Sequence, residues 1–356
     1  MMTRRKVLIA FNMAVLVALP GRVLARPLKT DETVLFIPGY ARETGDGLVE
    51  LAIRAWVFEF ERRPGARNIF TELLDIDLND ETPETRAIFA ERSRWFLTDS
   101  ERGKTLTIAF DGIDATDVSL PATDQAGRVD HGIRVPVPAG TRKIRFHTGR
   151  KGQRFEGQAF VLPETGLSVV SDIDDTIKIS NVADTRALLR GSMMAPFKPA
   201  PGMAQLYRDI AREAGNGFHY LSASPIQLLP ALLDFLDHEG FPEGSLHLRE
   251  STAWNRLVPS ESKTPEHKGG TLARLLADFP LRRFLFIGDS GEHDPEIYGD
   301  AVRAHPDRDI RILIRDVSAR PMTDARCAMA FSGIDPGRWH VMPESGPGPD
   351  GLPFKA

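Results

Sequence analysis

The feature that most constrains this chain is the stretch at residues 169–178, VVSDIDDTIK. A short apolar run is followed at once by three carboxylates, Asp172, Asp174 and Asp175. Carboxylates at the end of a buried strand are costly unless cations compensate for their charge. A divalent metal ion and a phosphoryl group together would provide that compensation. We therefore expect a buried strand that ends at a phosphate-handling site, with a simple acidic turn as the alternative.

The chain has 356 residues, a length that suits two domains better than one core. Its composition is that of a soluble globular protein, with 42% apolar and 26% charged residues. The single cysteine, Cys327, excludes an internal disulfide. We expect a signal peptide at 1–25, a β-rich domain at 31–163, an α/β domain at 166–343 and a flexible tail at 344–356.

The first 25 residues have the three parts of an export signal. Basic residues stand at 4–6, an apolar run at 7–19 and small residues close to position 25. Because the apolar run is too short to span a bilayer comfortably, we expect a cleaved signal peptide and an exported, periplasmic protein. Residues 3–8 also resemble a twin-arginine signal, and a retained membrane anchor is the alternative.

The net charge of the chain indicates whether nucleic acid is a suitable partner. The formal net charge is -4, and without the first 25 residues 41 basic and 49 acidic residues remain. Nonspecific nucleic-acid binding relies on cations that neutralise phosphates, so an acidic body is poorly suited to it. We expect no nucleic-acid partner.

Residues 33–163 are rich in short segments that alternate apolar and polar side chains. One helix interrupts the series, with Thr82 as its N-cap and Pro83 in its first position. This pattern predicts a small β-sandwich or barrel. The strand candidates lie at 34–37, 51–60, 106–110, 132–137, 144–147 and 158–162.

The pattern changes after Gly166, where strand-like runs alternate with helical ones. That alternation predicts βαβ units and a parallel sheet. We expect strands at 167–171, 218–221, 284–287 and 311–314. We expect helices at 204–213, at 225–239, at about 271–279 and from 295 onward.

Reactive residues stand where these parallel strands would end, and ligands bind beyond the carboxyl ends of such strands. Asp172 and Asp174 are two residues apart, so in an extended chain both point into the same crevice. One carboxylate can attack phosphorus, while the other protonates the leaving oxygen and later activates water. Asp175 points the other way, and we assign it no catalytic part.

Two further positions suit a phosphate. Ser222 follows the second predicted strand, where its hydroxyl and backbone N–H could hold a phosphate oxygen. Ser224, directly before a proline, is better placed as a helix N-cap. Lys268 lies just before, or in the first turn of, a predicted helix, where a cation opposes the helix dipole. Neutralising a phosphate explains this lysine better than helix stability does, and an ordinary surface lysine is the alternative.

Asp289 follows an apolar strand and Gly288, whose lack of a side chain lets the backbone approach a metal ion. Mg²⁺ prefers one or two carboxylates together with waters and phosphate oxygens, so Asp172, Asp289 and the carbonyl of Asp174 form a candidate site. Asp294 is either a metal-site residue or a helix cap. The string GDSGE at 288–292 lacks the final glycine of a serine-hydrolase elbow, which disfavours that enzyme class.

The order of these motifs resembles the haloacid dehalogenase superfamily of aspartate-nucleophile phosphatases. The strings SDIDDTIK at 171–178 and FIGDSGEHDPEIY at 286–298 resemble more narrowly the catalytic domain of the actin-patch-protein type of magnesium-dependent phosphatidate phosphatase. The resemblance covers about 166–317 and implies an α/β fold, namely a Rossmannoid parallel sheet with a minimal cap. It also implies hydrolysis of phosphatidate to diacylglycerol and phosphate through a phospho-aspartate intermediate, with Mg²⁺ as the cofactor.

The same resemblance implies residue roles. Asp172 would be the nucleophile, and Asp174 would be the general acid and base. The residues that contact the phosphoryl group would be Thr176, Ser222 and Lys268. The residues of the metal site would be Asp172, Asp174, Asp289 and Asp294.

Two alternative functions stay open. The short intervals between the motifs suit an open site, so the chain could be an exported phosphatase for another envelope phosphomonoester. It could also be a noncatalytic lipid- or protein-binding module whose acidic cluster merely holds an ion.

An apolar patch at 193–198 could contact a membrane surface peripherally, or it could be a buried loop. In either enzyme reading the partner is a phospholipid or another phosphomonoester.

Overall fold

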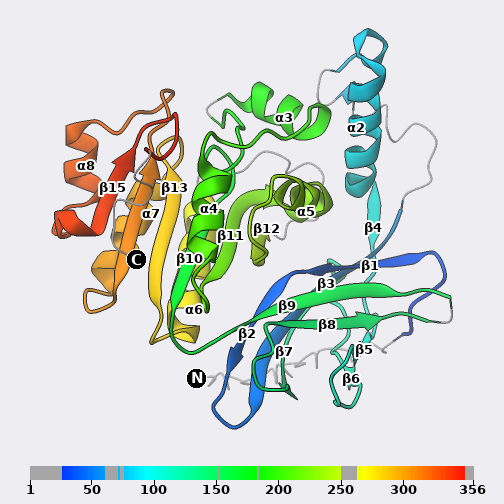
Figure 1. Cartoon of the computed structure of the whole chain (residues 1–356). Coiled ribbons are helices and arrows are strands. Elements are labelled where there is room, and N and C mark those ends of the chain that lie inside the picture. Colours follow the sequence, from blue (N-terminus) through cyan, green and yellow to red (C-terminus); the bar gives the residue numbers. More distant parts are fainter. Residues whose placement is uncertain are drawn as a thin grey trace, which may run out of the picture.

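The computed structural model describes residues 26–60, 71–72, 76–150, 152–182, 184–249 and 263–348. These residues form two sheets, one at each side of the molecule (Figure 1). The predicted signal peptide at 1–25 and most of the predicted tail lie outside the described residues. The first residue of that tail, Glu344, accepts hydrogen bonds from Arg315 and Ser318.

The N-terminal sheet is mixed, and its nine described strands are all linked by pairing. The long strand β3 pairs with β1 and β2 along one edge and with β7 and β4 along the other. Only the β2–β9 pairing is parallel among the described pairs of this sheet. Its strands are β1 (Glu32–Ile37), β2 (Gly39–Glu43), β3 (Leu48–Phe60), β4 (Thr98–Ser100), β5 (Thr107–Phe110), β6 (Val118–Ser119), β7 (Arg128–Pro136), β8 (Lys143–Thr148) and β9 (Phe155–Leu162).

The alternation in the sequence explains this sheet. Side chains that point inward from β1, β3, β7, β8 and β9 share one apolar core, in which Phe36 and Phe146 meet edge to face. The predicted helix is also present as α2 (Pro83–Ser93). The hydroxyl of Thr82 accepts a hydrogen bond from the backbone N–H of Thr85, and Pro83 occupies the first turn. The β-rich prediction for this region is therefore confirmed.

The C-terminal sheet has six described strands, all parallel, in the order β12-β11-β10-β13-β14-β15. They are β10 (Leu167–Asp172), β11 (Gly217–Pro225), β12 (Ser245–Arg249), β13 (Arg283–Asp289), β14 (Ile310–Arg315) and β15 (Trp339–Met342). The helices are α3 (Thr185–Met194), α4 (Met203–Ala211), α5 (Leu229–His238), α6 (Lys263–Asp278), α7 (Asp294–Ala304) and α8 (Asp324–Ala330). The predicted α/β fold with a parallel sheet is confirmed.

Both faces of this sheet are covered, which is why its central strands are continuous apolar runs. In β10, Val169 packs into the core that includes α4 and α5, while Val170 packs into the core that includes α6 and α7. Every residue of β10 is buried. The polar end of this strand is therefore buried as well, and its carboxylates meet protein groups rather than bulk water.

The strand order places a topological switch point between β10 and β13. From β10 the chain continues to β11 and β12 on one side, and it returns to β13, β14 and β15 on the other. In open parallel sheets of this order, the crevice for a ligand lies beyond the carboxyl ends of the two strands at the switch point. Here those ends carry Asp172 and Asp289.

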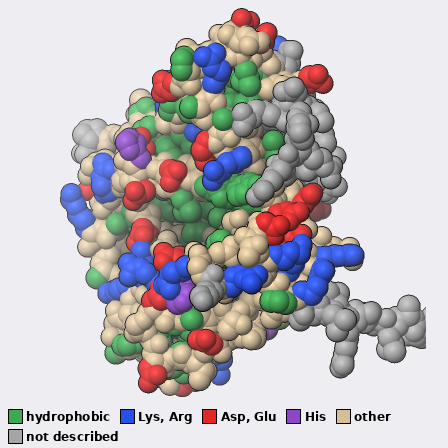
Figure 2. All heavy atoms as spheres, turned by 90° about the vertical axis from the view of Figure 1, so that its right-hand side faces the viewer, with side chains coloured by type: hydrophobic (Ala, Val, Ile, Leu, Met, Phe, Trp, Pro, Cys, Tyr) green, Lys and Arg blue, Asp and Glu red, His purple; other side chains and the backbone are tan. Residues whose placement is uncertain are grey.

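The two sheets are joined by direct contacts. The guanidinium of Arg54 donates to the carbonyl of Leu246 at 2.6 Å, and the hydroxyl of Tyr40 donates to Asp278 at 2.5 Å. Helix α2 stands beside α3 (Figure 1). On the face with α2, a hollow between the two parts has hydrophobic side chains at its centre (Figure 2). Phe60 and Trp95 are among the partly buried side chains that pack against the core shared by both parts.

Some sequence expectations differ from the structure. Helix α6 begins at Lys263, well before the expected position near Thr271, so Lys268 lies inside the helix rather than ahead of it. Strands β12 and β15 and helix α8 are short and carry no clear periodic signal. Helix α3 is as long as α5, and it is a further element absent from the sequence expectations. No helix among the described ranges is long and apolar enough to cross a membrane.

Candidate active site

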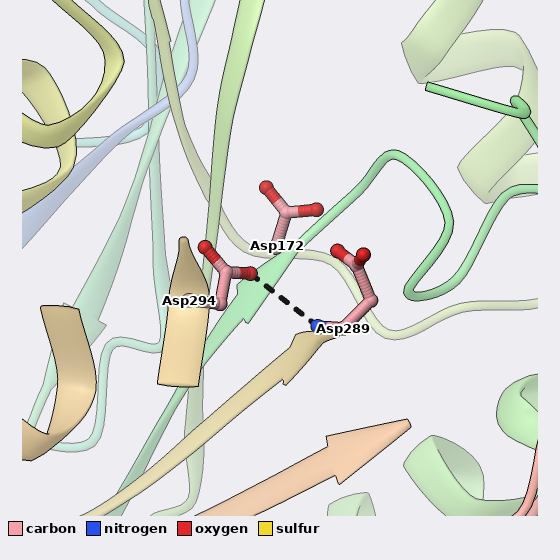
Figure 3. Close-up of side chains that lie close together, drawn as sticks. All are labelled: Asp172, Asp289 and Asp294. Atoms are coloured by element: carbon pink, nitrogen blue, oxygen red, sulfur yellow. Dashed lines mark hydrogen bonds between the residues drawn. The ribbon is translucent and has the colours of Figure 1, made fainter. Parts of the chain in front are cut away.

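Three carboxylates converge at the switch point. Asp172 ends β10, Asp289 ends β13 and Asp294 begins α7, and Figure 3 shows their carboxylates facing one another. One oxygen of each lies within 4.8 Å of the others, and all three residues are buried. The backbone N–H of Asp289 donates to Oδ2 of Asp294 at 3.4 Å, which ties the strand end to the helix start.

Gly288 makes this convergence possible. A β-carbon built on Gly288 would lie 2.7 Å from Cβ of Asp294 and equally close to the ring of Tyr298. No other residue type fits there without displacing α7, because atoms in a packed core cannot approach so closely. The glycine predicted to permit close approach therefore accommodates the Asp294 side chain.

A buried lysine lies among these carboxylates. Nζ of Lys268 is 2.7 Å from Oδ1 of Asp172, 2.5 Å from Oδ1 of Asp294 and 3.1 Å from Oε2 of Glu292. The lysine side chain is fully buried, so a surface role is ruled out. Burial lowers the lysine pKa, but the surrounding carboxylates, Asp172 first, outweigh burial and raise the pKa well above its ordinary value.

The ionised forms of these carboxylates are disfavoured by burial and by the other carboxylates of the group. Burial raises the pKa of Asp172 well above its ordinary value, Lys268 opposes that rise, and the neighbouring Asp294 and Asp289 add to it. Burial and Asp294 likewise raise the pKa of Asp289, and burial raises that of Asp294. One ammonium is therefore insufficient for this group, and a further cation would stabilise its ionised form.

The residues present fit a divalent metal ion. Asp172, Asp289 and Asp294 each bring one buried carboxylate oxygen to a common point, which is costly unless a cation meets them. The convergent donors are all carboxylate oxygens, the kind that Mg²⁺ prefers. The group formed by Asp172, Asp289 and Asp294 could therefore bind a metal ion.

The second carboxylate of the motif, Asp174, is turned to a different set of partners. Its Oδ1 lies 2.7 Å from Nζ of Lys178 and accepts a hydrogen bond from Ser180 at 2.7 Å. Its Oδ2 accepts hydrogen bonds from Ser222 and Ser224, each at 3.0 Å. Burial would raise the pKa of Asp174, but Lys178 and these hydroxyls outweigh burial and lower the pKa to about 2.

Asp175 shapes the loop that separates the two carboxylates. It adopts a left-handed conformation, with φ of 55°, and its carboxylate accepts the backbone N–H groups of Ser180, Asn181 and Val182. Its carbonyl accepts a hydrogen bond from Arg315 at 2.6 Å. These bonds hold the loop closed and turn the Asp175 side chain to backbone groups rather than to the acidic cluster.

The structure places the other predicted residues as follows. Thr176 is buried and donates to Oδ2 of Asp289 at 3.3 Å. Ser222 donates to Asp174, as described above. Ser224 was expected to be an N-cap, and that expectation is wrong, because β11 continues through Ser224 and its hydroxyl bonds to Asp174. Asp294 is the first residue of α7 and reaches into the acidic cluster, so its side chain does not serve as the cap.

Three polar residues of this site were missed from the sequence. Lys178 and Ser180 lie just after the aspartate motif, and Glu292 lies between Asp289 and Asp294. Their positions in the sequence offered one signal, because each of the three lies within a few residues of a predicted site residue. It could not show which way the side chains point, because the loops that carry them are irregular.

The fold and the site define a class. A parallel α/β sheet with three buried carboxylates and a buried lysine at its switch point is compatible with a metal-dependent phosphatase. Residues 167–316 match the sequence profile described as the catalytic domain of phosphatidate phosphatase APP1. The match falls on the region that carries the site, and the resemblance stated from the sequence is confirmed.

Relatives agree with this assignment. Phosphatidate phosphatase APP1 of Saccharomyces cerevisiae is 31% identical over 172 residues, which cover 45% of this chain and 29% of that protein. An uncharacterised protein of Schizosaccharomyces pombe is 31% identical over 163 residues, which cover 44% of this chain and 26% of that protein. The chain thus spans less than a third of the length of these relatives. A carbohydrate acetylesterase from Xanthomonas citri, a solved structure, aligns over 78% of this chain and 68% of its own, with 8% identity and a TM-score of 0.25, too low to indicate a shared fold.

Proposed function

We propose that this protein is a Mg²⁺-dependent phosphatidate phosphatase, which hydrolyses phosphatidate to diacylglycerol and phosphate through a phospho-aspartate at Asp172. One observation carries the proposal. Asp172 and Asp174 leave the same strand end but have separate partners, since Asp172 contacts Lys268 in the acidic cluster and Asp174 contacts Lys178 and serines. Two carboxylates in two different environments suit two different chemical tasks.

The first step forms a bond between a carboxylate oxygen of Asp172 and phosphorus and breaks the bond to the leaving alcohol. Oδ2 of Asp172 suits the attack because it accepts no hydrogen bond from any residue that the structure describes, whereas Oδ1 contacts Lys268. The leaving oxygen takes a proton from Asp174. The low pKa of that carboxyl group means that it is ionised in the free enzyme, so it must first take this proton from solvent as the phosphate arrives, and the negative charge of the phosphate favours that uptake.

The second step breaks the phospho-aspartate. Asp174, ionised again, takes a proton from a water molecule, and the water oxygen attacks phosphorus and releases Asp172 and inorganic phosphate. Lys268 keeps a positive charge next to the phosphoryl group throughout. The hydroxyls of Thr176 and Ser222 donate to Asp289 and Asp174, so each would have to turn from its carboxylate to donate to a phosphate oxygen. Mg²⁺ held by Asp172, Asp289 and Asp294 would neutralise charge on the phosphate oxygens.

The proposal is tested by phosphate release from phosphatidate micelles, measured with malachite green, with Mg²⁺ and with EDTA. We expect turnover with Mg²⁺, loss of turnover with EDTA, and loss of at least about a thousandfold in the Asp172→Asn variant. Asp117→Asn, on the exposed surface of the β-rich sheet, is the matched control and should keep full activity. Retained turnover in Asp172→Asn with Mg²⁺ present would contradict the nucleophile assignment.

A panel of phosphomonoesters separates the proposal from its alternatives. Preference for a monoester other than phosphatidate would make this a phosphatase for a different envelope substrate. Absence of Mg²⁺-supported turnover on every monoester would favour a noncatalytic binding module.

We also propose that the protein is exported to the periplasm, on the strength of the basic and apolar segments at its N-terminus. Sequencing the N-terminus of the protein recovered from the cell envelope tests this proposal. A mature chain that begins after about residue 25 is expected, and an intact N-terminus recovered from the cytoplasm would contradict it.

A further inference from the structure

The loop at 174–182 carries Asp174 and two of the residues that contact it. Lys178 and Ser180, both in this loop, contact Oδ1 of Asp174. Asp175 has a left-handed φ of 55°, which costs a residue other than glycine about 1–2 kcal/mol. Such a conformation persists only where the surrounding structure fixes it. The groups that hold this loop from outside therefore influence the geometry of Asp174.

One of these groups is Arg315, the last residue of β14. Its side chain is buried, and its guanidinium joins two backbone carbonyls. Nη1 donates to the carbonyl of Asp175 at 2.6 Å, while Nε and Nη2 donate to the carbonyl of Glu344 at 3.1 and 2.8 Å. Because Glu344 follows β15, this bridge connects the C-terminal part of the chain to the residue next to Asp174.

The C-terminal segment, which comprises residues 343–347, is anchored at two points besides this bridge. Oε2 of Glu344 accepts hydrogen bonds from the backbone N–H of Ser318 at 3.2 Å and from its hydroxyl at 2.7 Å. Gly346 is buried, has φ of 94° and lies so close to Pro201 that a β-carbon built on it would overlap the carbonyl oxygen of Pro201. A side chain at this position would displace the segment, because packed atoms cannot overlap.

Pro201 provides a second connection from the C-terminal segment to the loop. The residues just before Pro201 pair with the loop through two backbone hydrogen bonds. The N–H of Ile179 donates to the carbonyl of Lys198 at 2.9 Å, and the N–H of Ala200 donates to the carbonyl of Ile177 at 2.8 Å. The segment thus reaches the loop both through these bonds and through the guanidinium bridge.

We propose that the C-terminal segment and Arg315 are positioning elements for the reaction, because they hold the loop from which Asp174 gives its proton to the leaving oxygen. This inference rests on the proposed function. A misplacement of about 1 Å can lower a rate by about a hundredfold. Loosening the segment should impair proton transfer more than phosphate binding, since Lys268 and the metal-site carboxylates Asp289 and Asp294 lie on other elements.

The test compares Gly346→Val with Gly348→Val in the full chain. A β-carbon at Gly348 would meet nothing within 4 Å, so Gly348→Val is the matched control. Both variants and the parent are assayed with Mg²⁺ on a soluble short-chain phosphatidate and on p-nitrophenyl phosphate. The p-nitrophenolate ion leaves without a proton, so only the kcat/KM for phosphatidate depends on Asp174 as an acid.

In Gly346→Val we expect the ratio of kcat/KM for phosphatidate to that for p-nitrophenyl phosphate to fall at least about tenfold. In Gly348→Val the ratio should equal that of the parent. A purely structural role would lower both kcat/KM values equally and leave the ratio unchanged. An unchanged ratio in a folded Gly346→Val variant would therefore overturn the inference.

Hydrogen exchange gives an independent readout of the loop. Amides at 175–182 should exchange faster in Gly346→Val than in the parent, while those of α6 keep their rates. Glu344→Ala removes only the contact with Ser318 and should change exchange and ratio less, in the same direction, and it replaces Gly346→Val if that variant does not fold. Unchanged loop exchange would also overturn the inference. Absence of Mg²⁺-supported turnover in the parent would contradict the proposed function, while exchange would still decide whether the segment holds the loop.

Discussion

Nζ of Lys178 lies 2.7 Å from Oδ1 of Asp174, and both side chains are buried. This pair is separate from the one formed by Lys268 and Asp172, which is also 2.7 Å long. Each aspartate of the motif thus has its own lysine, supplied by a different part of the chain. Because the two ion pairs do not share an atom, the charge of one carboxylate can change while the other stays neutralised.

Replacing Lys178 should affect both stability and turnover. Lys178→Met leaves a buried carboxylate with only hydroxyl partners, so we expect the free energy of unfolding to fall by about 3–5 kcal/mol. We expect kcat to fall by roughly tenfold or more, because Asp174 loses the group that positions it. Urea unfolding and steady-state kinetics measure the two effects, and Lys178→Arg should restore part of each. A variant with parental kcat would show that the pair is only structural.

Lys268→Met should make the fold depend on metal. Without the ammonium, three buried carboxylates face one another, and repulsion destabilises the native state. We expect a large drop in the melting temperature with EDTA and a clear recovery with millimolar Mg²⁺, larger than in the parent protein. Lys143→Met is the control, because Lys143 pairs with the exposed Glu243 and such pairs contribute only about 0–1 kcal/mol. Recovery that is no greater than in the parent would argue against a metal site here.

The free energy of unfolding should fall at acidic pH, and His219 should account for part of that fall. Its ring is buried between Ser245 and Ser168, and burial, with Arg282 nearby, lowers its pKa to about 3. In the unfolded chain the pKa is about 6.5, so between that pH and about 3 the unfolded chain binds a proton that the native state does not. The free energy of unfolding should therefore fall by about 1.4 kcal/mol per pH unit as the pH drops through this window.

Urea unfolding of His219→Gln at several pH values tests this contribution. The variant should lose part of the dependence between about pH 6.5 and 4, since the group responsible is gone. His340→Gln, at an exposed position, should keep the parental dependence. Identical curves for His219→Gln and the parent would mean that other groups account for the acid sensitivity.

Arg92, which belongs to helix α2, should hold the end of helix α3 in place. Burial lowers the pKa of its guanidinium to about 10, and the side chain stacks on Phe197 with its Cζ 3.9 Å from the ring centre. In Arg92→Leu the carbonyls at the end of α3 that accept its hydrogen bonds lose their donor, so we expect about 1–3 kcal/mol of destabilisation and faster hydrogen exchange at 185–194. Arg212→Leu, an exposed arginine at the end of α4, is the control. Unchanged exchange in α3 would show that Arg92 does not hold the helix.

Much of the α/β part could be predicted because its signals are local. The apolar runs of β10 and β13 and the glycine before Asp289 follow from burial and backbone geometry alone. The switch point then follows from the strand order, which the sequence only suggests. Short elements such as β12 and β15 escaped prediction, since a few residues carry too little periodicity to separate a strand from a loop.

The partners of the site residues were beyond sequence reasoning. Ser224 stands before a proline like a helix cap, but its hydroxyl is drawn to Asp174 because β11 continues past it. Lys268 was expected at or near the start of a helix and is instead buried within α6, among carboxylates from other elements. Such contacts join residues far apart in the chain, and no local pattern records them.

By itself the sequence determined which strands are buried and that Asp172 and Asp174 stand at the end of one of them, and it predicted a phosphate-handling site there. Those conclusions depend on the period of apolar residues and on residue types at strand ends, which are local properties. Only the tertiary structure decided that the two aspartates have different lysines and that the C-terminal segment reaches the loop beside Asp174. These features depend on how α6, β14 and the C-terminal segment pack, and packing is set by the whole fold rather than by any one segment.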